Sequence, residues 1–428
     1  MSHTNRGTAM AHLVGGISSA GRAMPPLDGV ALRIVRSHGP FLWDDQGRRY
    51  IDYLLGMGAD FLGHAPPEVI AAVTRALDNG PMPGLAHPLE EEAAAALAAH
   101  LGPLDRIVFL NSGSEAVHLA CRTARVATGR ARIAKFAAGF DGWLDDVAFG
   151  NTASPAAAMD ANTRPATDRT VLLRHNDFDD VERLFAEHDD IAAILVEPVL
   201  ANAGCIEEAP GYLTHLQAVA RRHGALVIAD EVLMGFRLHP GLTSTLLGLE
   251  PDLATLGKAI GSGLPVAALA GRPDIMALLE QGRVARAGTY SGNPPACAAV
   301  AATMRALAAL DYPALLARGQ RLRAGITTAL HAAGQPASTS GHGSVFSLWF
   351  TPTPPATYAQ AVALADAPRS LALHLALRRH GVMTLRSPFG RMFLSAAHGD
   401  AEIDATLAAF AAAAPELAHA MELISHKI

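Results

Sequence analysis

Apolar and polar positions follow two different periods along the chain. Between about residues 66 and 310, short apolar runs typical of buried strands alternate with longer segments in which apolar residues recur at helical spacing. The predicted strands are 107–110, 132–136, 192–198, 225–229, 254–256 and 266–270. The predicted helices include 67–77, 89–101, 115–127, 178–187 and 211–223. This alternation predicts a mostly parallel sheet that is covered by helices on both faces and binds ligands at the carboxyl ends of its strands.

The two ends of the chain have a looser pattern. Residues 1–40 read as irregular, and FLWDDQGRRYIDY (41–53) predicts a hairpin around an Asp-Asp-Gln-Gly turn. Beyond about residue 311 we expect a helix, a strand, a second helix, another strand and a final helix, with the first strand and second helix at 344–350 and 371–380. The polar, alanine-rich stretch 151–168 reads as a connection.

These patterns predict three parts in an α/β protein. They are an N-terminal segment that joins the small domain, a large cofactor-binding domain and a smaller α+β domain, at 1–65, 66–310 and 311–428.

Composition excludes several classes of partner. Half of the 428 residues are hydrophobic, 17% are charged and the net charge is −6, so nucleic acid and anionic membrane surfaces are not expected partners. The three cysteines are widely separated without CxxC spacing, which argues against a disulfide framework or a zinc site. The start of the chain lacks signal-peptide features and no apolar run reaches the roughly 18 residues of a membrane helix, so we expect a cytoplasmic protein.

Lys258 stands out against this background. It follows the apolar run PDLATLG (251–257) and precedes the glycine-rich AIGSGLP (259–265), where a ligand can approach the backbone closely. A lysine that forms a Schiff base must lose its proton easily, and partial burial beside a cationic cofactor lowers its pKa. The alternative is a solvated surface lysine, which is the usual environment of this residue.

Asp230 ends the apolar run ALVIA (225–229). A carboxylate at a strand end can accept a hydrogen bond from a protonated pyridine nitrogen, which keeps the ring cationic and able to take up the electrons of a carbanion. The alternative is an acid that caps the next element. Together, Lys258 and Asp230 supply the amine and the acid that a pyridoxal phosphate enzyme requires.

Two further turns have the features of phosphate contacts. In NSGSEA (111–116) a strand runs into a helix start, where free N–H groups, a glycine and a hydroxyl suit a phosphate. The alternative is an ordinary helix start capped by Ser114, with Glu115 in the first turn. The turn GTYSGNP (288–294) is either another phosphate contact or a loop. HExxH, P-loop, GxGxxG and GxSxG signatures of competing sites are absent from the sequence.

Taken together and in order, five segments resemble the class III aminotransferases of pyridoxal phosphate fold type I, and among them glutamate-1-semialdehyde aminomutase and its relatives. These segments are GPFLWDDQGRRYIDY (39–53), NSGSEA (111–116), VEPVLANAG with IADEVLMGFR (196–204 and 228–237), TLGKAIGSGLP (255–265) and GTYSGNP (288–294). The resemblance extends from Gly15 to about Leu407. It implies the fold type I architecture and pyridoxal 5′-phosphate as the cofactor.

The resemblance also implies a role for each matching residue. Lys258 forms the Schiff base and later moves the substrate proton, and Asp230 holds the ring nitrogen. The other implied cofactor contacts are Ser112, Gly113 and Ser114 at the phosphate, Val232 and Phe140 on the two ring faces, Glu197 and Asn202 near the 3′ oxygen, and Thr289 from the neighbouring subunit. A threonine that comes from a second copy implies a homodimer.

The chain departs from the family in places that bear on substrate. Residues 139–143 read GFDGW where relatives carry Tyr-His-Gly, so Phe140 lacks the hydroxyl and Asp141 replaces an imidazole. Gly390, beside Arg391, stands where the aminomutase has a glutamate, and 151–168 matches the aminomutase gating loop poorly. These differences count against mutase activity.

Arg22 is the residue that the resemblance offers for a substrate carboxylate, since a guanidinium makes bidentate contacts with a carboxylate. The alternative is a solvated arginine in a mobile terminus, and Arg386 and Arg391 are further candidates for the carboxylate contact.

Three hypotheses about function follow from the sequence. They are a transaminase that moves an amino group from an amino donor, such as an amino acid, to a carbonyl acceptor, an intramolecular 2,1-aminomutase, and a non-catalytic cofactor-binding protein.

Overall fold

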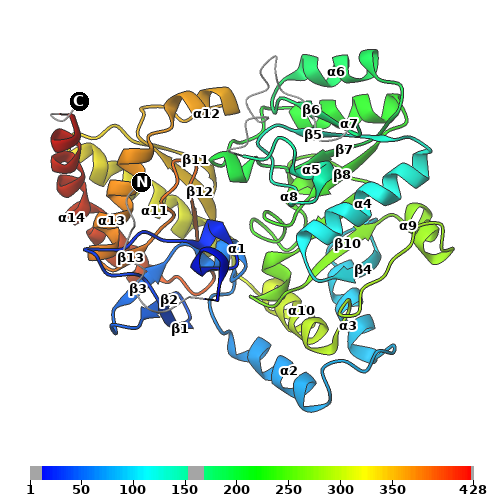
Figure 1. Cartoon of the computed structure of the whole chain (residues 1–428), viewed down its shortest axis with the longest axis horizontal. Coiled ribbons are helices and arrows are strands. Elements are labelled where there is room, and N and C mark those ends of the chain that lie inside the picture. Colours follow the sequence, from blue (N-terminus) through cyan, green and yellow to red (C-terminus); the bar gives the residue numbers. More distant parts are fainter. Residues whose placement is uncertain (1–11, 153–167, 426–428) are drawn as a thin grey trace.

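A seven-stranded sheet forms the centre of the larger lobe in the computed structural model, which describes residues 12–152 and 168–425 (Figure 1). The strand order is β4-β10-β9-β8-β7-β5-β6. Its strands are β4 (Arg106–Leu110), β5 (Arg132–Phe136), β6 (Thr170–Leu173), β7 (Ile191–Val196), β8 (Leu226–Asp230), β9 (Leu253–Leu256) and β10 (Ala267–Gly271). Of these seven, β10 alone runs antiparallel to its neighbours, so the predicted mostly parallel sheet is confirmed.

Helices cover both faces of this sheet, because its strands are apolar on both sides. In β8, Val227 and Ala229 join one buried cluster and Ile228 joins another, as expected for side chains that alternate across a strand. The helices of this lobe are α2 (Pro67–Asp78), α3 (Pro88–Ala98), α4 (Gly113–Thr128), α5 (Asp145–Ala148), α6 (Phe178–Glu187), α7 (Tyr212–Arg222), α8 (Thr243–Leu246), α9 (Pro273–Glu280), α10 (Pro294–Ala308) and the 3₁₀ turns η4 (Ala201–Ala203) and η5 (Lys258–Gly261).

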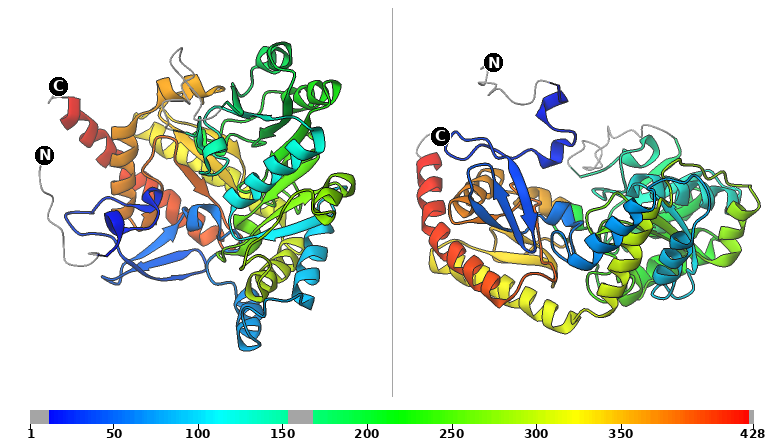
Figure 2. Two further views of the ribbon diagram at one scale, coloured as in Figure 1. Left: turned by 45° about the vertical axis from the view of Figure 1, so that its right-hand side comes forward. Right: turned by 90° about the horizontal axis from the view of Figure 1, so that it is seen from below.

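The smaller lobe combines both ends of the chain, and Figure 2 shows the two lobes from two further directions. It contains two sheets, with strand orders β1-β2-β3-β13 and β11-β12-β14. Its strands are β1 (Ile34–His38), β2 (Phe41–Asp44), β3 (Arg49–Asp52), β11 (Ser338–His342), β12 (Val345–Trp349), β13 (Val382–Met383) and β14 (Arg391–Phe393). Its helices are η1 (Val14–Gly16), η2 (Ala20–Arg22), α1 (Leu55–Gly58), α11 (Tyr312–Ala332), α12 (Tyr358–Leu364), α13 (Ala367–Arg379) and α14 (Asp400–Ser425).

The parallel pairing of β3 with β13 joins segments more than 300 residues apart, with Ile51 opposite Val382.

The domain limits given by the sequence stay a prediction. In the described residues, no single helix is long and apolar enough to cross a membrane, and the bent pair α10 and α11 passes that test together by length and composition alone.

Two features of the fold differ from the sequence prediction. Residues 34–38 form the strand β1, although 1–40 read as irregular. All five of its side chains are exposed, so no alternation of apolar and polar positions marks it. The edge strand β6 at 170–173 was also missed, because its short Thr-Val-Leu-Leu run follows the polar connection. Most of that connection, 153–167, lies outside the described residues.

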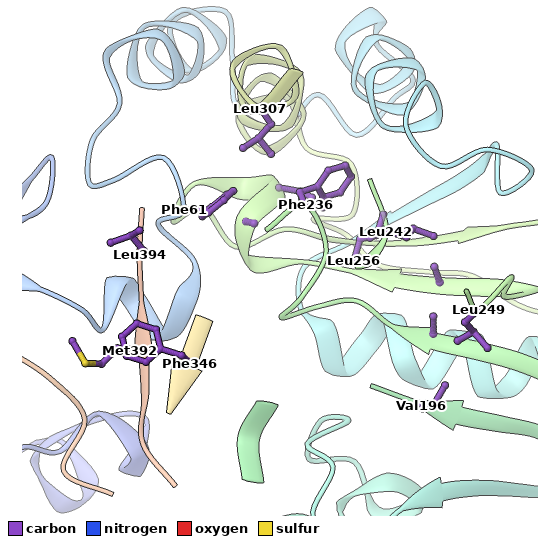
Figure 3. Close-up of a cluster of buried hydrophobic side chains, with 14 of the residues drawn as sticks. Phe61, Val196, Phe236, Leu242, Leu249, Leu256, Leu307, Phe346, Met392 and Leu394 are labelled. Atoms are coloured by element: carbon purple, nitrogen blue, oxygen red, sulfur yellow. The ribbon is translucent and has the colours of Figure 1, made fainter. Parts of the chain in front are cut away.

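An apolar core continues from the large sheet into the small lobe (Figure 3). Phe236 and Leu256 approach it from the large lobe, Leu307 lies above them on α10, and Phe346 and Leu394 belong to the small lobe. All five side chains are fully buried. Burial of this size fixes the small lobe against the carboxyl ends of the large-lobe strands.

Arg237 links the lobes within this core. Its side chain is fully buried, Nε donates to the Leu233 carbonyl at 2.5 Å, and an Nη group donates to the Gly58 carbonyl. The guanidinium lies over the rings of Phe61 and Phe393, 5.1 and 5.3 Å from their centroids. One large-lobe cation therefore contacts an aromatic ring from each end of the chain.

His64 gives the fold a pH-dependent contribution to stability. Burial alone lowers its pKa, but the Asp52 hydrogen bond at 2.8 Å and the charges of Asp60 and Asp52 outweigh burial, so the net pKa is raised. A pKa raised on folding stabilises the protein below the unfolded value of about 6.5, and this contribution is lost as pH rises through the folded value. We expect His64→Asn to reduce the free energy of unfolding by about 1–2 kcal/mol near pH 5.5 and by less near pH 8.5. Urea unfolding of both proteins at each pH measures this, and an equal loss at the two pH values would contradict it.

Candidate active site

The predicted site residues converge because they follow the carboxyl ends of neighbouring strands. The chain leaves the sheet at that edge after β4, β5, β7, β8 and β9. The segments that leave it carry Ser112 to Ser114, Phe140, Glu197 with Asn202, Asp230 with Val232, and Lys258. In a mostly parallel sheet these ends meet at one edge, which places the five segments around a common space.

Lys258 begins the η5 turn directly after β9. Its backbone has a φ of 44°, in the left-handed region that residues with a side chain rarely adopt. The side chain is half-buried. Burial lowers its pKa, the cations Arg391 and Arg237 lower it further, and Asp230 and Glu197 oppose this, so the net pKa lies well below the ordinary lysine value. The amine is therefore set to act as a base and nucleophile near neutral pH.

Asp230 is the last residue of β8 and is 4% exposed. Its Oδ1 accepts hydrogen bonds from the Val232 amide at 3.0 Å and from the Thr255 hydroxyl at 3.1 Å. No hydrogen bond in the described part of the chain uses its Oδ2, which leaves this oxygen for a ring nitrogen. Burial raises the pKa of Asp230, and the nearby charge of Asp141 raises it further. A cationic ring nitrogen would stabilise the ionised form.

The helix that begins at Gly113 has its N-cap two residues earlier than the alternative considered from the sequence. Ser112, not Ser114, is the N-cap, and its Oγ accepts from the Glu115 amide at 3.3 Å. Glu115 Oε2 in turn accepts from the amides of Asn111 and Ser112, which completes a capping box. The Gly113 and Ser114 amides precede the first bond of the helix, from the Ala116 amide to the Ser112 carbonyl, so they are free for an anion.

Val232 forms the floor between these segments. A Cβ added to Gly113 would lie 2.9 Å from a Val232 methyl, and one added to Gly257 would lie 3.2 Å from it. The absence of side chains at both positions brings the α4 start and the β9 end close to Val232. This leaves a shallow platform with anion-binding amides at one side and Lys258 at the other.

Glu197 is buried at the opposite side of the site. Its Oε1 accepts from the Phe140 amide at 2.7 Å, and its Oε2 lies 3.4 Å from the Asn202 amide nitrogen. Burial raises the pKa of Glu197, and the charges of Asp141 and Asp230 raise it further. Phe140 itself is 46% exposed, so one face of its ring is available to a planar ligand.

The structure contains a buried cation that the sequence reading missed. Lys135, on β5, is fully buried, and its Nζ lies 2.8 Å from Oδ2 of Asp141. The sequence signal was present as a lone lysine in the apolar strand 132–136, four residues before the altered GFDGW segment. From the sequence, Asp141 is predicted to replace an imidazole with a negative charge, but nothing there assigns it a partner.

Two predicted residues are not brought to this site within one chain. Thr289 lies on an exposed loop between α9 and α10. Arg22 is exposed on η2, and the adjacent Ala23 carbonyl accepts a long 3.4 Å bond from Arg386 Nε. Arg22 and Arg386 therefore lie near each other on the N-terminal segment, and no contact in the described residues connects either to Lys258.

Comparison with known proteins identifies the family. The family model for aminotransferase class-III matches residues 24–413. The chain belongs to the class III aminotransferases. It is 38% identical over 408 residues to a glutamate-1-semialdehyde 2,1-aminomutase of Rhodopirellula baltica, a match that covers 94% of this chain and 93% of the relative.

Solved structures of class III aminotransferases have the same fold. An omega-transaminase from Sphaerobacter thermophilus matches with a TM-score of 0.88 and 31% identity over 95% of each chain. A beta-phenylalanine aminotransferase from Variovorax paradoxus matches with a TM-score of 0.82 and 31% identity over 94% of this chain and 90% of the other. The predicted fold type I architecture and the transaminase class are thereby confirmed.

A class III aminotransferase uses pyridoxal phosphate, and a matching transaminase structure has it bound. The residues of this chain fit that group. Free amides at Gly113 and Ser114 suit its phosphate, Oδ2 of Asp230 suits its ring nitrogen, and the half-buried amine of Lys258 suits its aldehyde. The missing side chain at Gly113 lets the α4 start pack directly against Val232, which brings the free amides close to that residue.

Arg391 is a second cation at this class III site. It begins β14 opposite Ser347 and is partly buried. Its Nε is buried without a hydrogen-bond partner in the described residues, and no carboxylate there lies within ion-pair distance of it. Burial lowers its pKa, and its charge acts on both Lys258 and Glu197. A desolvated guanidinium without an anion is costly, which indicates an anionic ligand.

Proposed function

We propose that this aminotransferase is a two-substrate transaminase whose amino donors carry a carboxylate, and that it is not an aminomutase. The observation that carries the carboxylate-bearing donor is the position of Arg391, and the distinction from the aminomutase rests on the neighbouring Gly390. A guanidinium that lies partly buried, faces the site of Lys258 and has no carboxylate partner in the described chain is suited to bind a substrate carboxylate in a bidentate manner. Among relatives, one that matches over most of this chain acts on beta-phenylalanine, which bears a carboxylate.

The neighbouring glycine supports the distinction from the aminomutase. Gly390 stands where the resemblance places a glutamate in the mutase, and a Cβ there would lie 2.7 Å from the Ser387 carbonyl. The 387–390 turn is therefore too tight to hold a glutamate without moving its own backbone. The change at this position belongs to the shape of the loop, since a side chain does not fit there.

The reaction follows from the placement of three groups. When bound, the cofactor supplies an electron sink for the pair left behind as the donor's Cα–H bond breaks. Lys258 Nζ takes the Cα proton, for which its lowered pKa suits it. Asp230 would accept a hydrogen bond from the ring nitrogen through Oδ2, since the Val232 amide bonds to Oδ1, and its negative charge would favour the cationic ring. Arg391 orients the donor by its carboxylate, so that the Cα–H bond faces Lys258.

A donor and acceptor panel tests the proposal against the mutase alternative. With purified holoenzyme and a carboxylate-bearing amino donor, we expect a keto product to accumulate only when a separate carbonyl acceptor is supplied. The visible absorbance of the cofactor should shift when the donor alone is added. Isomerisation of glutamate-1-semialdehyde without any acceptor would instead establish the aminomutase. A cofactor spectrum that no amine changes would favour the non-catalytic alternative.

We expect Arg391→Ala to raise KM for carboxylate-bearing donors roughly 10- to 100-fold, because one charge-assisted bidentate contact is lost. Donors without a carboxylate, such as 1-phenylethylamine, should retain their KM. Steady-state kinetics with both donor types measures the difference. Arg22→Ala and Arg386→Ala are the matched controls, since both arginines lie on the surface near the N-terminal segment. An equal loss for both donor types would remove Arg391 from the carboxylate site, and a selective loss in Arg22→Ala would assign the contact to Arg22.

The proposed assembly is a homodimer in which Thr289 of one copy reaches the phosphate of the other. The loop that carries Thr289 is exposed, and it presents Tyr290, whose side chain is 65% exposed. Leu85 and Trp143, 79% and 74% exposed, are further large apolar side chains on the surface of one chain. Exposed apolar side chains of this size are typical of surfaces that a second copy covers.

A further inference from the structure

Lys135 has a complete set of acceptors in the protein interior. Its Nζ donates to the Val147 carbonyl at 2.6 Å and to Asn151 Oδ1 at 2.8 Å, and it lies 2.8 Å from Oδ2 of Asp141. The Gly139 carbonyl, 3.5 Å away, is the third hydrogen-bond acceptor, so the three protons of the ammonium group have partners, and Asp141 Oδ2 contacts it as an ion pair without a hydrogen bond of its own. Lys135 is fully buried and Asp141 is 2% exposed, so water does not screen the pair.

The pair lies directly behind the loop that carries Phe140. Above Gly139, the space for a side chain is bounded by two carboxylates, with Asp141 Oδ2 at 3.1 Å and Glu197 Oε1 at 3.5 Å from an added Cβ. Glu197 is itself held by the Phe140 amide at 2.7 Å. The loop therefore runs between two acids, one of which is paired with Lys135.

The same cluster reaches the phosphate turn. Asn151, which accepts from Lys135, donates its own amide to the Gly142 carbonyl at 2.7 Å. A Cβ added to Gly142 would lie 2.8 Å from Ser114 Oγ, so the loop packs directly on the helix start that has the free amides. Lys135 is thus connected to two parts of the site. One is the loop that carries Phe140, whose ring is available to a planar ligand, and the other is the helix start whose free amides suit a phosphate.

The balance of charge around the pair is also unusual. Three buried acids, Asp141, Glu197 and Asp230, lie close enough to act on one another. Lys258 faces Glu197 and Asp230, and Lys135 compensates Asp141. The other titratable or charged groups that face the pair are Cys121 and Arg125 on α4 and Asp146 on α5, where Arg125 and Asp146 form an ion pair at 2.9 Å. Without Lys135, the three acids would repel one another in a desolvated site.

We propose that Lys135 and Asp141 form a buried charge pair that positions the 139–142 loop against the cofactor and allows Asp230 to stay ionised beside two other acids. This inference rests on the proposed assignment of the cradle to pyridoxal phosphate and names two positioning residues within it. Asp141 provides the link between Lys135 and the loop, and Lys135 provides the cation that offsets the added negative charge. Neither residue takes part in the proton transfer.

The test is a double-mutant cycle with Lys135→Met, Asp141→Asn and the double variant. The affinity of each full-length, cofactor-free protein for pyridoxal 5′-phosphate is titrated by visible absorbance over a range of pH. We expect each single variant to bind the cofactor roughly 10- to 100-fold more weakly near neutral pH, because it leaves a buried partner uncompensated. The double variant is expected to bind the cofactor more tightly than either single variant, since both buried charges are removed together, but less tightly than the wild type, because Val147 and Asn151 lose their hydrogen-bond donor. A double variant that binds no more tightly than the single variants would contradict the proposal.

The pH profile separates an electrostatic role from a purely structural one. Loss of the Lys135 cation raises the pKa of the remaining acids, so in Lys135→Met the fall in affinity towards low pH should begin at a higher pH than in the wild type. Loss of the Asp141 anion lowers it, so in Asp141→Asn the fall should begin at a lower pH. A merely structural defect would weaken both variants without moving their profiles in opposite directions. Profiles that shift in the same direction, or not at all, would overturn the proposal.

Arg132→Met is the matched control on the same strand. Arg132 pairs with Asp190 at 2.5 Å, but both side chains are about a third exposed and lie at the opposite end of β5. We expect its cofactor affinity and pH profile to equal those of the wild type, and a change as large as that of Lys135→Met would overturn the proposal. If Lys135→Met does not fold, the cofactor affinity and pH profile of Asp141→Asn are compared with those of the double variant, which tests the same coupling between the two charges. Wild-type protein that failed to bind the cofactor would reject the assignment of the cradle, which is a separate outcome.

Discussion

Replacing Lys258 with alanine is expected to abolish amino transfer. The side chain combines two functions, because it is the amine that would attach the cofactor and the base that would take the Cα proton. Proton transfer by a positioned side chain alone accounts for roughly 10²- to 10⁴-fold in rate, and loss of the attachment adds to this. In Lys258→Ala we expect no keto product above background and no change in the cofactor's visible spectrum when donor is added. Product formation by chromatography and the donor-dependent spectrum measure both effects.

Two controls make the Lys258 result specific. The phosphate amides of Gly113 and Ser114 belong to a different element, so Lys258→Ala should still bind pyridoxal 5′-phosphate, although without a covalent link that borohydride can trap. It should also sediment as the wild type does, because the half-buried Lys258 side chain makes no hydrogen bond or ion pair to another element among the described residues. Lys135→Met is a useful comparison, since it removes a buried lysine from another strand of the same sheet and should retain the borohydride-trapped link. Full activity of Lys258→Ala would refute the assignment of the site.

Replacing Asp230 with asparagine is expected to lower kcat by about 10²- to 10³-fold. The amide has nearly the same shape and can keep the bonds from Val232 and Thr255 through its oxygen. It carries no negative charge, however, so it does not stabilise a cationic ring nitrogen, and the electron sink weakens. The expected pattern is a fall in kcat with a small change in donor KM, because the interaction strengthens as the Cα–H bond breaks. Stopped-flow measurement of the first half-reaction measures this step directly.

Asp230→Glu is the control that separates the charge of the carboxylate from its position. It keeps the carboxylate but moves it by one methylene group in a buried site, so we expect intermediate activity. Thr255→Val tests the support of Asp230, since it removes one of the two bonds to Oδ1 and should cost less than Asp230→Asn. If Asp230→Asn retained wild-type kcat, the ring nitrogen would have to be held by another group.

The sequence predicted the large sheet well because its strands are apolar on both faces and end in distinctive residues. The β8 strand with Asp230 and the β9 strand before Lys258 were located to within a residue, and the sheet's mostly parallel order follows from the alternation of helices and strands. The convergence of the site segments also followed from that order. The individual roles of the cofactor residues, the domain limits and the cytoplasmic location stay predictions.

The features that were missed depend on tertiary context. The strand β1 has no buried face, so no periodicity marks it. The choice between Ser112 and Ser114 as helix cap is a matter of a few backbone angles, which two serines separated by one glycine do not decide. The role of Lys135 depends on its distance from Asp141 and Asn151, and no sequence spacing shows that these side chains meet. Arg391 was one of three arginine candidates, and only its burial without an anion separated it from the others.

The pairing of β3 with β13 also has a consequence for how the protein is made. The ribosome synthesises the N-terminal strands long before the segment around Val382. The edge of β3 therefore remains unpaired while the large lobe can already fold. The small lobe is then completed last, by a contact that closes a loop of most of the chain, and such long-range contacts form slowly. A nascent chain that stalls beyond the large lobe would expose β3 as an open edge, which is the kind of surface that chaperones bind and that aggregation begins from.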